Sequence, residues 1–327
     1  MGFKPTSVIW KNGQWVGWHD ATVHVLAHGL HYGSSVFEGV RAYATPQGPA
    51  IFRNAEHVRR LFESARIYGM PIDHTPGEIE QACREVVSRN GLTSAYIRPI
   101  VYRSAGTFSL APGDDAPVEV AIAAIEWGEY LGDGAINNGI DVCVSSWRRL
   151  STSAAPVMSK AGGHYLNAQL IAGEAKRNGY AEGIALDVHG NLSEGSGENV
   201  FVVRNGSLYT PPLSSSVLDG ITRDTVIQLA AEVGIPVREQ SLPREMLYTA
   251  DEIFLTGTAA EITPVRSVDR TPVADGTPGP ITRRMQEIFF GLFKGATHDR
   301  WGWLDFVSPS ASAAGAHANG FVVRMRD

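Results

Sequence analysis

Four short motifs in the second half of the chain carry residue types that could do chemistry together. Lys160 stands among small residues in the stretch 159–165, and its amine could form a Schiff base with an aldehyde. Glu194 follows a turn and lies beside two glycines, where a carboxylate could pair with a protonated ring nitrogen. Residues 219–224 and 257–264 are turns that offer backbone N–H donors to an anion.

These are the groups that a pyridoxal-phosphate enzyme must supply, because that cofactor carries its own electron sink. Each motif, taken alone, also has a structural interpretation that involves no cofactor. Lys160 would then be a surface lysine, Glu194 an exposed turn carboxylate and Thr222 an ordinary helix cap. Arg60 could reach a phosphate or remain solvated. The joint occurrence of the motifs favours the cofactor interpretation.

Two further groups of residues have a functional and a structural interpretation. His24, His28 and His31 have helical spacing, but no carboxylate or cysteine cluster accompanies them, so we predict packing histidines and no metal site. Tyr96 and Arg98 share one face of a predicted strand, since side chains alternate along a strand. That face either meets solvent or recognises a carboxylate.

Local patterns in the first half predict the elements that must hold these residues. Asn12-Gly13 is typical of a two-residue hairpin turn. A helix is expected to begin near Asn54, which can cap it, and another follows the capping box Thr75-Pro76-Gly77-Glu78. Strands are expected over 8–10, 15–18, 36–43, 50–52, 94–102 and 118–125.

The stretch 126–139 contains four glycines and separates two parts of the chain. We predict a small N-terminal α+β domain over 1–130, an interdomain loop over 131–139 and a larger cofactor-binding domain over 140–307. Mixed strands and helices without strict alternation indicate an α+β fold of two α/β domains. In the second half, strands are expected near 140–147, 183–188, 199–204, 207–210 and 252–256, and helices near 164–177, from Thr222, and over 281–292.

Composition excludes several functional classes for this chain of 327 residues. Its net charge of −6 is interspersed, so neither nucleic acid nor an anionic membrane is an expected partner. Cys83 and Cys143 are the only cysteines and are expected to be reduced thiols. Neither a signal peptide nor a spanning segment is predicted, which favours the cytoplasm. The Ser-, Ala- and Gly-rich tail over 308–327 is expected to be disordered.

Seven ordered motifs closely resemble those of the bacterial branched-chain amino acid aminotransferases, which are fold type IV pyridoxal-phosphate enzymes. The resemblance runs from about Val8 to Val307. It implies the architecture of the D-amino acid aminotransferase-like enzymes and a role in branched-chain amino acid biosynthesis. The motifs lie at His31–Gly39, Ala95–Pro99, Lys160–Gly163, Gly183–Asp187, Glu194–Asn199, Gly220–Arg223 and Gly257–Glu261.

The resemblance implies roles for the residues that would bind pyridoxal 5′-phosphate. Lys160 corresponds to the Schiff-base lysine, Glu194 to the partner of the pyridine nitrogen, and Tyr165 to the partner of the ring oxygen. Leu218 corresponds to the residue that packs on the ring. The phosphate cup would be formed by Arg60, Ile221, Thr222 and Thr258.

The resemblance also implies a substrate pocket shared between subunits. Leucine, isoleucine or valine would give its amino group to 2-oxoglutarate in a reversible ping-pong reaction. Arg98 corresponds to the arginine that takes the distal carboxylate of glutamate. A dimer would be the smallest complete unit of a homo-oligomer, with a hexamer as the larger alternative. The remaining correspondences are Tyr96, Thr258 and Ala259 to the α-carboxylate site, Phe37, Trp127 and Tyr130 to the side-chain pocket, and Tyr32 and Leu110 to a neighbouring subunit's contribution.

Two kinds of alternative stay open at this point. Within the class, the chain could be a D-amino acid aminotransferase, an aminodeoxychorismate lyase or an R-selective amine transaminase. Tyr96-Ile97-Arg98 favours the branched-chain L-type. Outside it, a non-enzymatic cofactor binder or a metal module is disfavoured by the full set of phosphate, ring and carboxylate groups. The loop 103–110 departs from the glycine-richer family pattern, which affects substrate range and not the chemistry.

Overall fold

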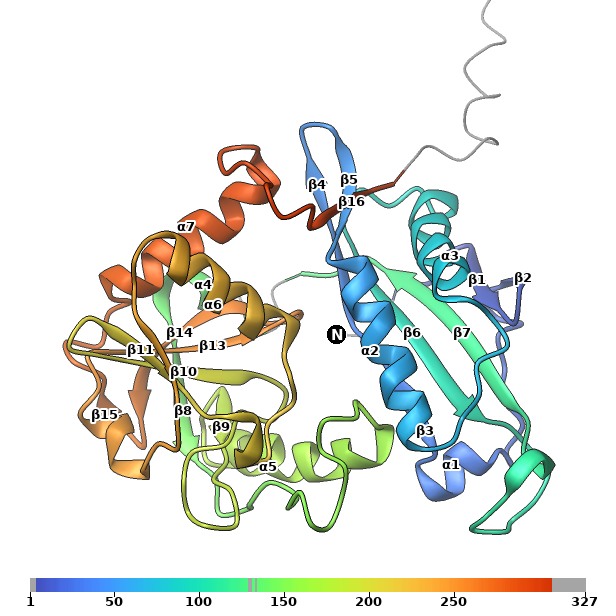
Figure 1. Cartoon of the computed structure of the whole chain (residues 1–327), viewed down its shortest axis with the longest axis horizontal. Coiled ribbons are helices and arrows are strands. Elements are labelled where there is room, and N and C mark those ends of the chain that lie inside the picture. Colours follow the sequence, from blue (N-terminus) through green and yellow to red (C-terminus); the bar gives the residue numbers. More distant parts are fainter. Residues whose placement is uncertain (1–3, 129–130, 133, 308–327) are drawn as a thin grey trace, which may run out of the picture.

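The computed structural model describes residues 4–128, 131–132 and 134–307 and contains two β-sheets with helices packed against them. The strand order is β16-β5-β4-β6-β7-β1-β2 in the first sheet, where β3 also pairs with β6, and β12-β11-β10-β13-β14-β8-β9 in the second, where β15 also pairs with β14. The sheets stand side by side in Figure 1. Antiparallel and parallel pairs occur together in the second sheet, which confirms the predicted α+β class.

The first sheet is built from the N-terminal part of the chain and one returning strand, β16. Its strands are β1 (Val8–Lys11), β2 (Gln14–Gly17), β3 (Ser35–Phe37), β4 (Val40–Thr45), β5 (Gly48–Phe52), β6 (Ala95–Arg103), β7 (Val118–Ile125) and β16 (Leu304–Phe306). Its helices are α1 (His28–Tyr32), α2 (Asn54–Ile67) and α3 (Pro76–Arg89), with a short 3-10 helix at Gly113–Asp115. The predicted hairpin is confirmed, because Asn12 and Gly13 have φ of 47° and 83° between β1 and β2.

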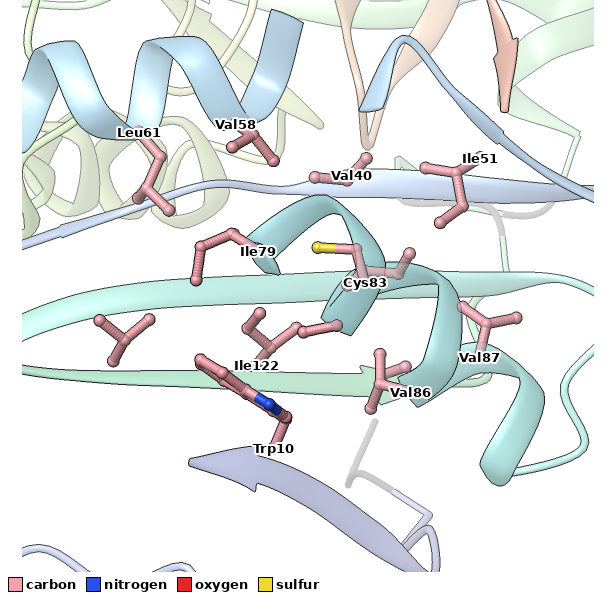
Figure 2. Close-up of a cluster of buried hydrophobic side chains, with 14 of the residues drawn as sticks. Trp10, Val40, Ile51, Val58, Leu61, Ile79, Cys83, Val86, Val87 and Ile122 are labelled. Atoms are coloured by element: carbon pink, nitrogen blue, oxygen red, sulfur yellow. The ribbon is translucent and has the colours of Figure 1, made fainter. Parts of the chain in front are cut away.

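Helices α2 and α3 pack on this sheet and form its hydrophobic core. Figure 2 shows Val58 and Leu61 of α2 near Ile79 and Cys83 of α3, with Ile122 of β7 in the same cluster. All five side chains are buried, and each buried aliphatic group of this size stabilises the fold by about 1.5–3 kcal/mol. The faces of α2 and α3 that carry these residues are therefore the ones that meet the sheet.

The ends of these helices confirm one prediction and correct another. Thr75 accepts a hydrogen bond from the Glu78 N–H while the Glu78 side chain bonds the Thr75 N–H, so the capping box is confirmed. Helix α2 begins at Asn54 as predicted, but Asn54 does not cap it. Its amide donates to Asp305 and to the Glu80 carbonyl, and the residue before the helix is Arg53, with φ of 53°.

The single strand predicted over 36–43 is wrong, because Glu38 and Gly39 interrupt it between β3 and β4. The pairing register with β6 is the same on both sides of the break. The Glu38 N–H donates to the Pro99 carbonyl, but Pro99 has no N–H with which to return the bond. The interruption therefore follows from a proline on the neighbouring strand.

The second sheet forms from the remaining strands and has its own set of helices packed on it. Its strands are β8 (Ile140–Val144), β9 (Glu182–Ile184), β10 (Asn199–Arg204), β11 (Ser207–Thr210), β12 (Val237–Glu239), β13 (Glu252–Gly257), β14 (Glu261–Val268) and β15 (Thr271–Pro272). Its helices are α4 (Ala135–Asn138), α5 (Tyr165–Arg177), α6 (Ile221–Glu232) and α7 (Pro280–Lys294), with 3-10 turns at Gly162–His164, Leu213–Ser215 and Arg244–Tyr248. Figure 1 shows α6 and α7 on one side of this sheet and α5 at another edge.

One strand predicted for this half is shorter in the structure than expected. The strand expected over 183–188 ends at Ile184, since Ala185 instead exchanges hydrogen bonds with the loop at Ser193 and Glu194. None of the described helices has the length and apolar character that a bilayer span requires. The predicted tail over 308–327 and part of the predicted loop over 131–139 lie outside the described residues.

Candidate active site

A cavity of about 260 Å³ lies between the two sheets and brings together most of the predicted site residues. It is bordered by the Lys160 loop, the start of α6, the turn after β13 and the side chains of β6. The predicted residues that line it are Phe37, Arg60, Tyr96, Arg98, Trp127, Lys160, Tyr165, Glu194, Leu218, Ile221, Thr222, Thr258 and Ala259.

Lys160 is held in the cavity by contacts from both halves of the chain. Its Nζ donates to the Tyr165 hydroxyl at 2.6 Å. Its main-chain N–H donates to Ser64 Oγ at 3.0 Å, and its carbonyl accepts from the Phe37 N–H at 3.0 Å. A Cβ on Gly162, two residues after the lysine, would overlap Ser35 Oγ, so glycine there permits the close approach of the loop to β3. The main chain of Lys160 is therefore fixed by α2 and β3, and its amine is held by Tyr165 at the start of α5.

Glu194 is buried in the wall of the same cavity, and both of its oxygens accept hydrogen bonds. Oε1 accepts from Arg149 Nη2 at 2.5 Å, and Oε2 accepts from Asn199 Nδ2 and from the Leu218 N–H, each at 3.0 Å. Burial raises the pKa of Glu194 above its ordinary value, and the Arg149 charge and these hydrogen bonds oppose that rise. The hydrogen bonds from Arg149, Asn199 and Leu218 therefore fix the orientation of this carboxyl group in the cavity wall.

The N-terminus of α6 opens into the same cavity and could hold a phosphate. Gly220 precedes the helix without a side-chain cap, and a Cβ there would overlap the Asn199 amide oxygen. The first N–H groups of a helix carry partial positive charge and bind anions. Arg60 of α2 reaches across and donates from Nη1 to the Asp219 carbonyl at 2.7 Å. Thr258 lines the cavity from the turn after β13.

Aromatic rings and one arginine form the opposite wall. Tyr96 stacks on Trp127 with ring centroids 4.7 Å apart. Arg98 donates to the Tyr96 hydroxyl at 3.3 Å and lies over the Phe37 ring at 4.6 Å. The shared face predicted for Tyr96 and Arg98 is therefore confirmed. A Cβ on Gly39 would overlap the Tyr96 hydroxyl, so glycine there makes room for the phenol.

A family model described as amino-transferase class IV matches residues 35–268. The chain belongs to the class IV aminotransferases. It is 54% identical over 308 residues to the branched-chain-amino-acid aminotransferase of Escherichia coli (strain K12). This alignment covers 94% of this chain and 100% of that relative. A relative with the same name from Pseudomonas aeruginosa is 46% identical over 301 residues, covering 92% of this chain and 97% of that one.

Solved structures of class IV aminotransferases agree with this membership. The crystal structure of the Escherichia coli branched-chain amino acid aminotransferase aligns with a TM-score of 0.92 at 54% identity, covering 93% of this chain and 100% of that one. The branched-chain amino acid aminotransferase of Thermobaculum terrenum, solved in its PLP form, aligns with a TM-score of 0.86 at 37% identity, covering 93% and 99%. These likenesses confirm the predicted resemblance and the fold type IV architecture.

Two residues predicted for this aminotransferase site do not line the cavity, and a third cannot be placed. Tyr32 is 45% exposed and Leu110 is 82% exposed, and both lie on the surface near Phe108. Tyr130 lies outside the described residues. His28, one of the three histidines, contacts Ser34 Oγ and the Ser109 carbonyl, and no metal-binding group of three or more side chains occurs in the described ranges.

Several polar residues in or behind the walls of the aminotransferase cavity were missed by the sequence analysis. Arg149 and Asn199 bond Glu194, and Ser64 bonds the Lys160 main chain. Glu38 forms an ion pair with Arg60, and His57 is hydrogen-bonded to the same carboxylate. Glu38 and Asn199 lie within the motifs that carry the resemblance, and those motifs could have identified them. Ser64, Arg149 and His57 lie outside these motifs, and no local sequence pattern indicates their roles.

Proposed function

We propose that this class IV aminotransferase moves the amino group of leucine, isoleucine or valine to 2-oxoglutarate, giving a branched 2-oxo acid and L-glutamate. The observation that carries the proposal is the wall in which Arg98 lies between the rings of Phe37 and Tyr96. The rings and Trp127 offer apolar surface to an aliphatic side chain. The same pocket must also accept glutamate. The positively charged Arg98 guanidinium can form an ion pair with the distal carboxylate of that substrate.

The residues of the cavity fit pyridoxal 5′-phosphate. Two buried polar atoms in its walls, Arg149 Nε and Thr256 Oγ1, have no protein partner among the described residues, as expected where a polar ligand binds. Glu194 would hold the ring nitrogen, and the start of α6 would hold the phosphate. When bound, the cofactor supplies an aldehyde for amine exchange and a ring that withdraws electrons.

The protein groups then have distinct tasks in the transfer. Lys160 is the nucleophilic amine and afterwards carries the proton from the substrate Cα, with Tyr165 orienting its Nζ. Glu194 would keep the ring nitrogen protonated. Leu218 would pack on the ring. All the residues proposed for the phosphate and the α-carboxylate line the cavity. The phosphate would be bound by Arg60, Ile221, Thr222 and Thr258, and the substrate α-carboxylate by Tyr96, Thr258 and Ala259.

The assembly proposed for this reaction is a homodimer or a larger homo-oligomer in the cytoplasm. Tyr32 and Leu110 are exposed apolar residues, which supports their use in a neighbouring subunit's pocket. Tyr130 is proposed as a further pocket residue. The division into domains over 1–130 and 140–307, joined by the loop 131–139, likewise remains a proposal, with the site between them.

The substrate class is tested by assaying the purified holoenzyme with L-leucine and with D-leucine, each with 2-oxoglutarate. We expect turnover with the L form and little with the D form. Activity with D-leucine alone would favour a D-amino acid aminotransferase, and pyruvate release from aminodeoxychorismate would favour the lyase. Rates with valine, isoleucine, phenylalanine and methionine would then define the range that Phe108 and Leu110 permit.

Replacing Arg98 with alanine should separate the two substrates of the reaction. We expect kcat/KM for L-glutamate to fall about 10- to 30-fold, since a charge-assisted bond to the distal carboxylate is lost. The value for L-leucine should change less than about threefold. Arg66→Ala, on an exposed site of α2, is the matched control. Equal losses for the two amino acids would contradict the role of Arg98.

A further inference from the structure

Glu38 is fully buried at the interruption between β3 and β4, and it does not line the cavity. Its oxygens accept from Arg60 Nε at 2.6 Å and Arg60 Nη2 at 2.8 Å, which is a two-point contact with one edge of the guanidinium. His57 Nδ1 lies 2.7 Å from Glu38 Oε2. A buried carboxylate with these three bonds is placed to orient Arg60.

The charges in this cluster are defined by burial and by the contacts within it. Burial alone would raise the pKa of Glu38, but the Arg60 charge and the hydrogen bonds from Arg60 and His57 outweigh it and hold the pKa below its ordinary value. Burial lowers the pKa of His57. Glu38 is therefore ionised, and neutral His57 donates its Nδ1–H to it.

The orientation of Arg60 determines which of its N–H groups reach the cavity. A guanidinium has five N–H donors in a fixed plane. Glu38 takes two of them and the Asp219 carbonyl takes a third, which leaves one N–H on Nη1 and one on Nη2. Arg60 borders the cavity beside the start of α6, so these two donors remain for an anion there.

We propose that Glu38, with His57 behind it, is a positioning residue for the cofactor phosphate, acting through Arg60. The inference rests on the proposed function, because the phosphate is that of pyridoxal 5′-phosphate. The alternative is a purely structural ion pair, whose loss would weaken the whole site without regard to the ligand. The two roles differ in one measurable way: positioning affects ligands that carry a phosphate and spares those that lack one.

The test measures binding of pyridoxal 5′-phosphate and of pyridoxal to the full-length chain stripped of cofactor, by quenching of tryptophan fluorescence. In Glu38→Gln we expect the Kd for pyridoxal 5′-phosphate to rise about tenfold or more, because the two-point hold on Arg60 is lost. The Kd for pyridoxal should change less than about twofold. Glu63→Gln, on an exposed site of α2, the helix that carries Arg60, should change neither.

Two further variants keep the proposal testable if Glu38→Gln does not fold. His57→Leu removes a donor to Glu38 and should raise the Kd for pyridoxal 5′-phosphate about threefold or more. His57→Asn keeps a donor near the Nδ1 position, so its Kd should return to that of the unchanged protein. Equal losses for both ligands, or no rescue by asparagine, would overturn the positioning role.

Arg60→Gln separates this proposal from the proposed function. If Arg60→Gln weakens pyridoxal 5′-phosphate selectively while Glu38→Gln does not, the inference about Glu38 is wrong and the phosphate cup stands. If Arg60→Gln shows no selectivity for the phosphorylated ligand, the assignment of the cup itself fails. Selective weakening by both variants supports the two proposals together.

Discussion

Lys160→Ala is expected to lower kcat for L-leucine and 2-oxoglutarate by about 10⁴-fold or more, measured with added pyridoxal 5′-phosphate. Loss of one acid–base group costs up to about 10⁴-fold, and this variant also loses the nucleophile. Cofactor binding should weaken but persist, because Glu194 and the start of α6 remain. Borohydride reduction should attach the cofactor covalently to Lys160 in the unchanged protein, and Lys160→Ala should show no such attachment. Mass spectrometry of the peptide that contains residue 160 checks this result.

Lys176→Ala is the control for this experiment, since Lys176 is exposed on α5, the helix that follows the Lys160 loop. It should keep both turnover and the cofactor attachment at Lys160. Turnover of Lys160→Ala near that of the control would remove Lys160 from the mechanism, whatever its contact with Tyr165.

Glu194→Gln is expected to lower kcat by about a hundredfold, with little change in fold. Glutamine has nearly the same shape but no charge, so a charge-assisted bond to the ring nitrogen is replaced by a weaker neutral one. A hydrogen bond to a charged group is worth about 1.5–3 kcal/mol in all, and each 1.4 kcal/mol corresponds to roughly tenfold in rate. The measurement is the steady-state rate with L-leucine and 2-oxoglutarate, together with the visible absorption of the bound cofactor.

The comparison variant is Glu287→Gln, an identical change at an exposed site of α7. It should leave the rate and the absorption unchanged. If Glu194→Gln retains more than about a third of the rate, a carboxylate opposite the ring nitrogen is not required, and Arg149 would have another role than balancing Glu194.

Features that depend on neighbours in the chain were predictable from sequence. Asn12-Gly13 makes its turn, and Thr75 caps its helix, because both involve residues at most three positions apart. Lys160 and Tyr165 are five residues apart, and the glycines between them permit close approach to β3. Their contact therefore follows from a single short motif.

Features that depend on distant partners were decided only by the tertiary structure. Pro99 on β6 ends the pairing at Glu38, which the local strand pattern of 36–43 could not reveal. Arg149 reaches Glu194 from 45 residues away, and Ser64 reaches Lys160 from 96 residues away. Short-range hydrogen bonds are set by the order of residue types along the chain. A charged group becomes buried beside its partner only after the sheets have packed. The sequence therefore determined which groups are available, and the fold determined which of them meet and in what charge state.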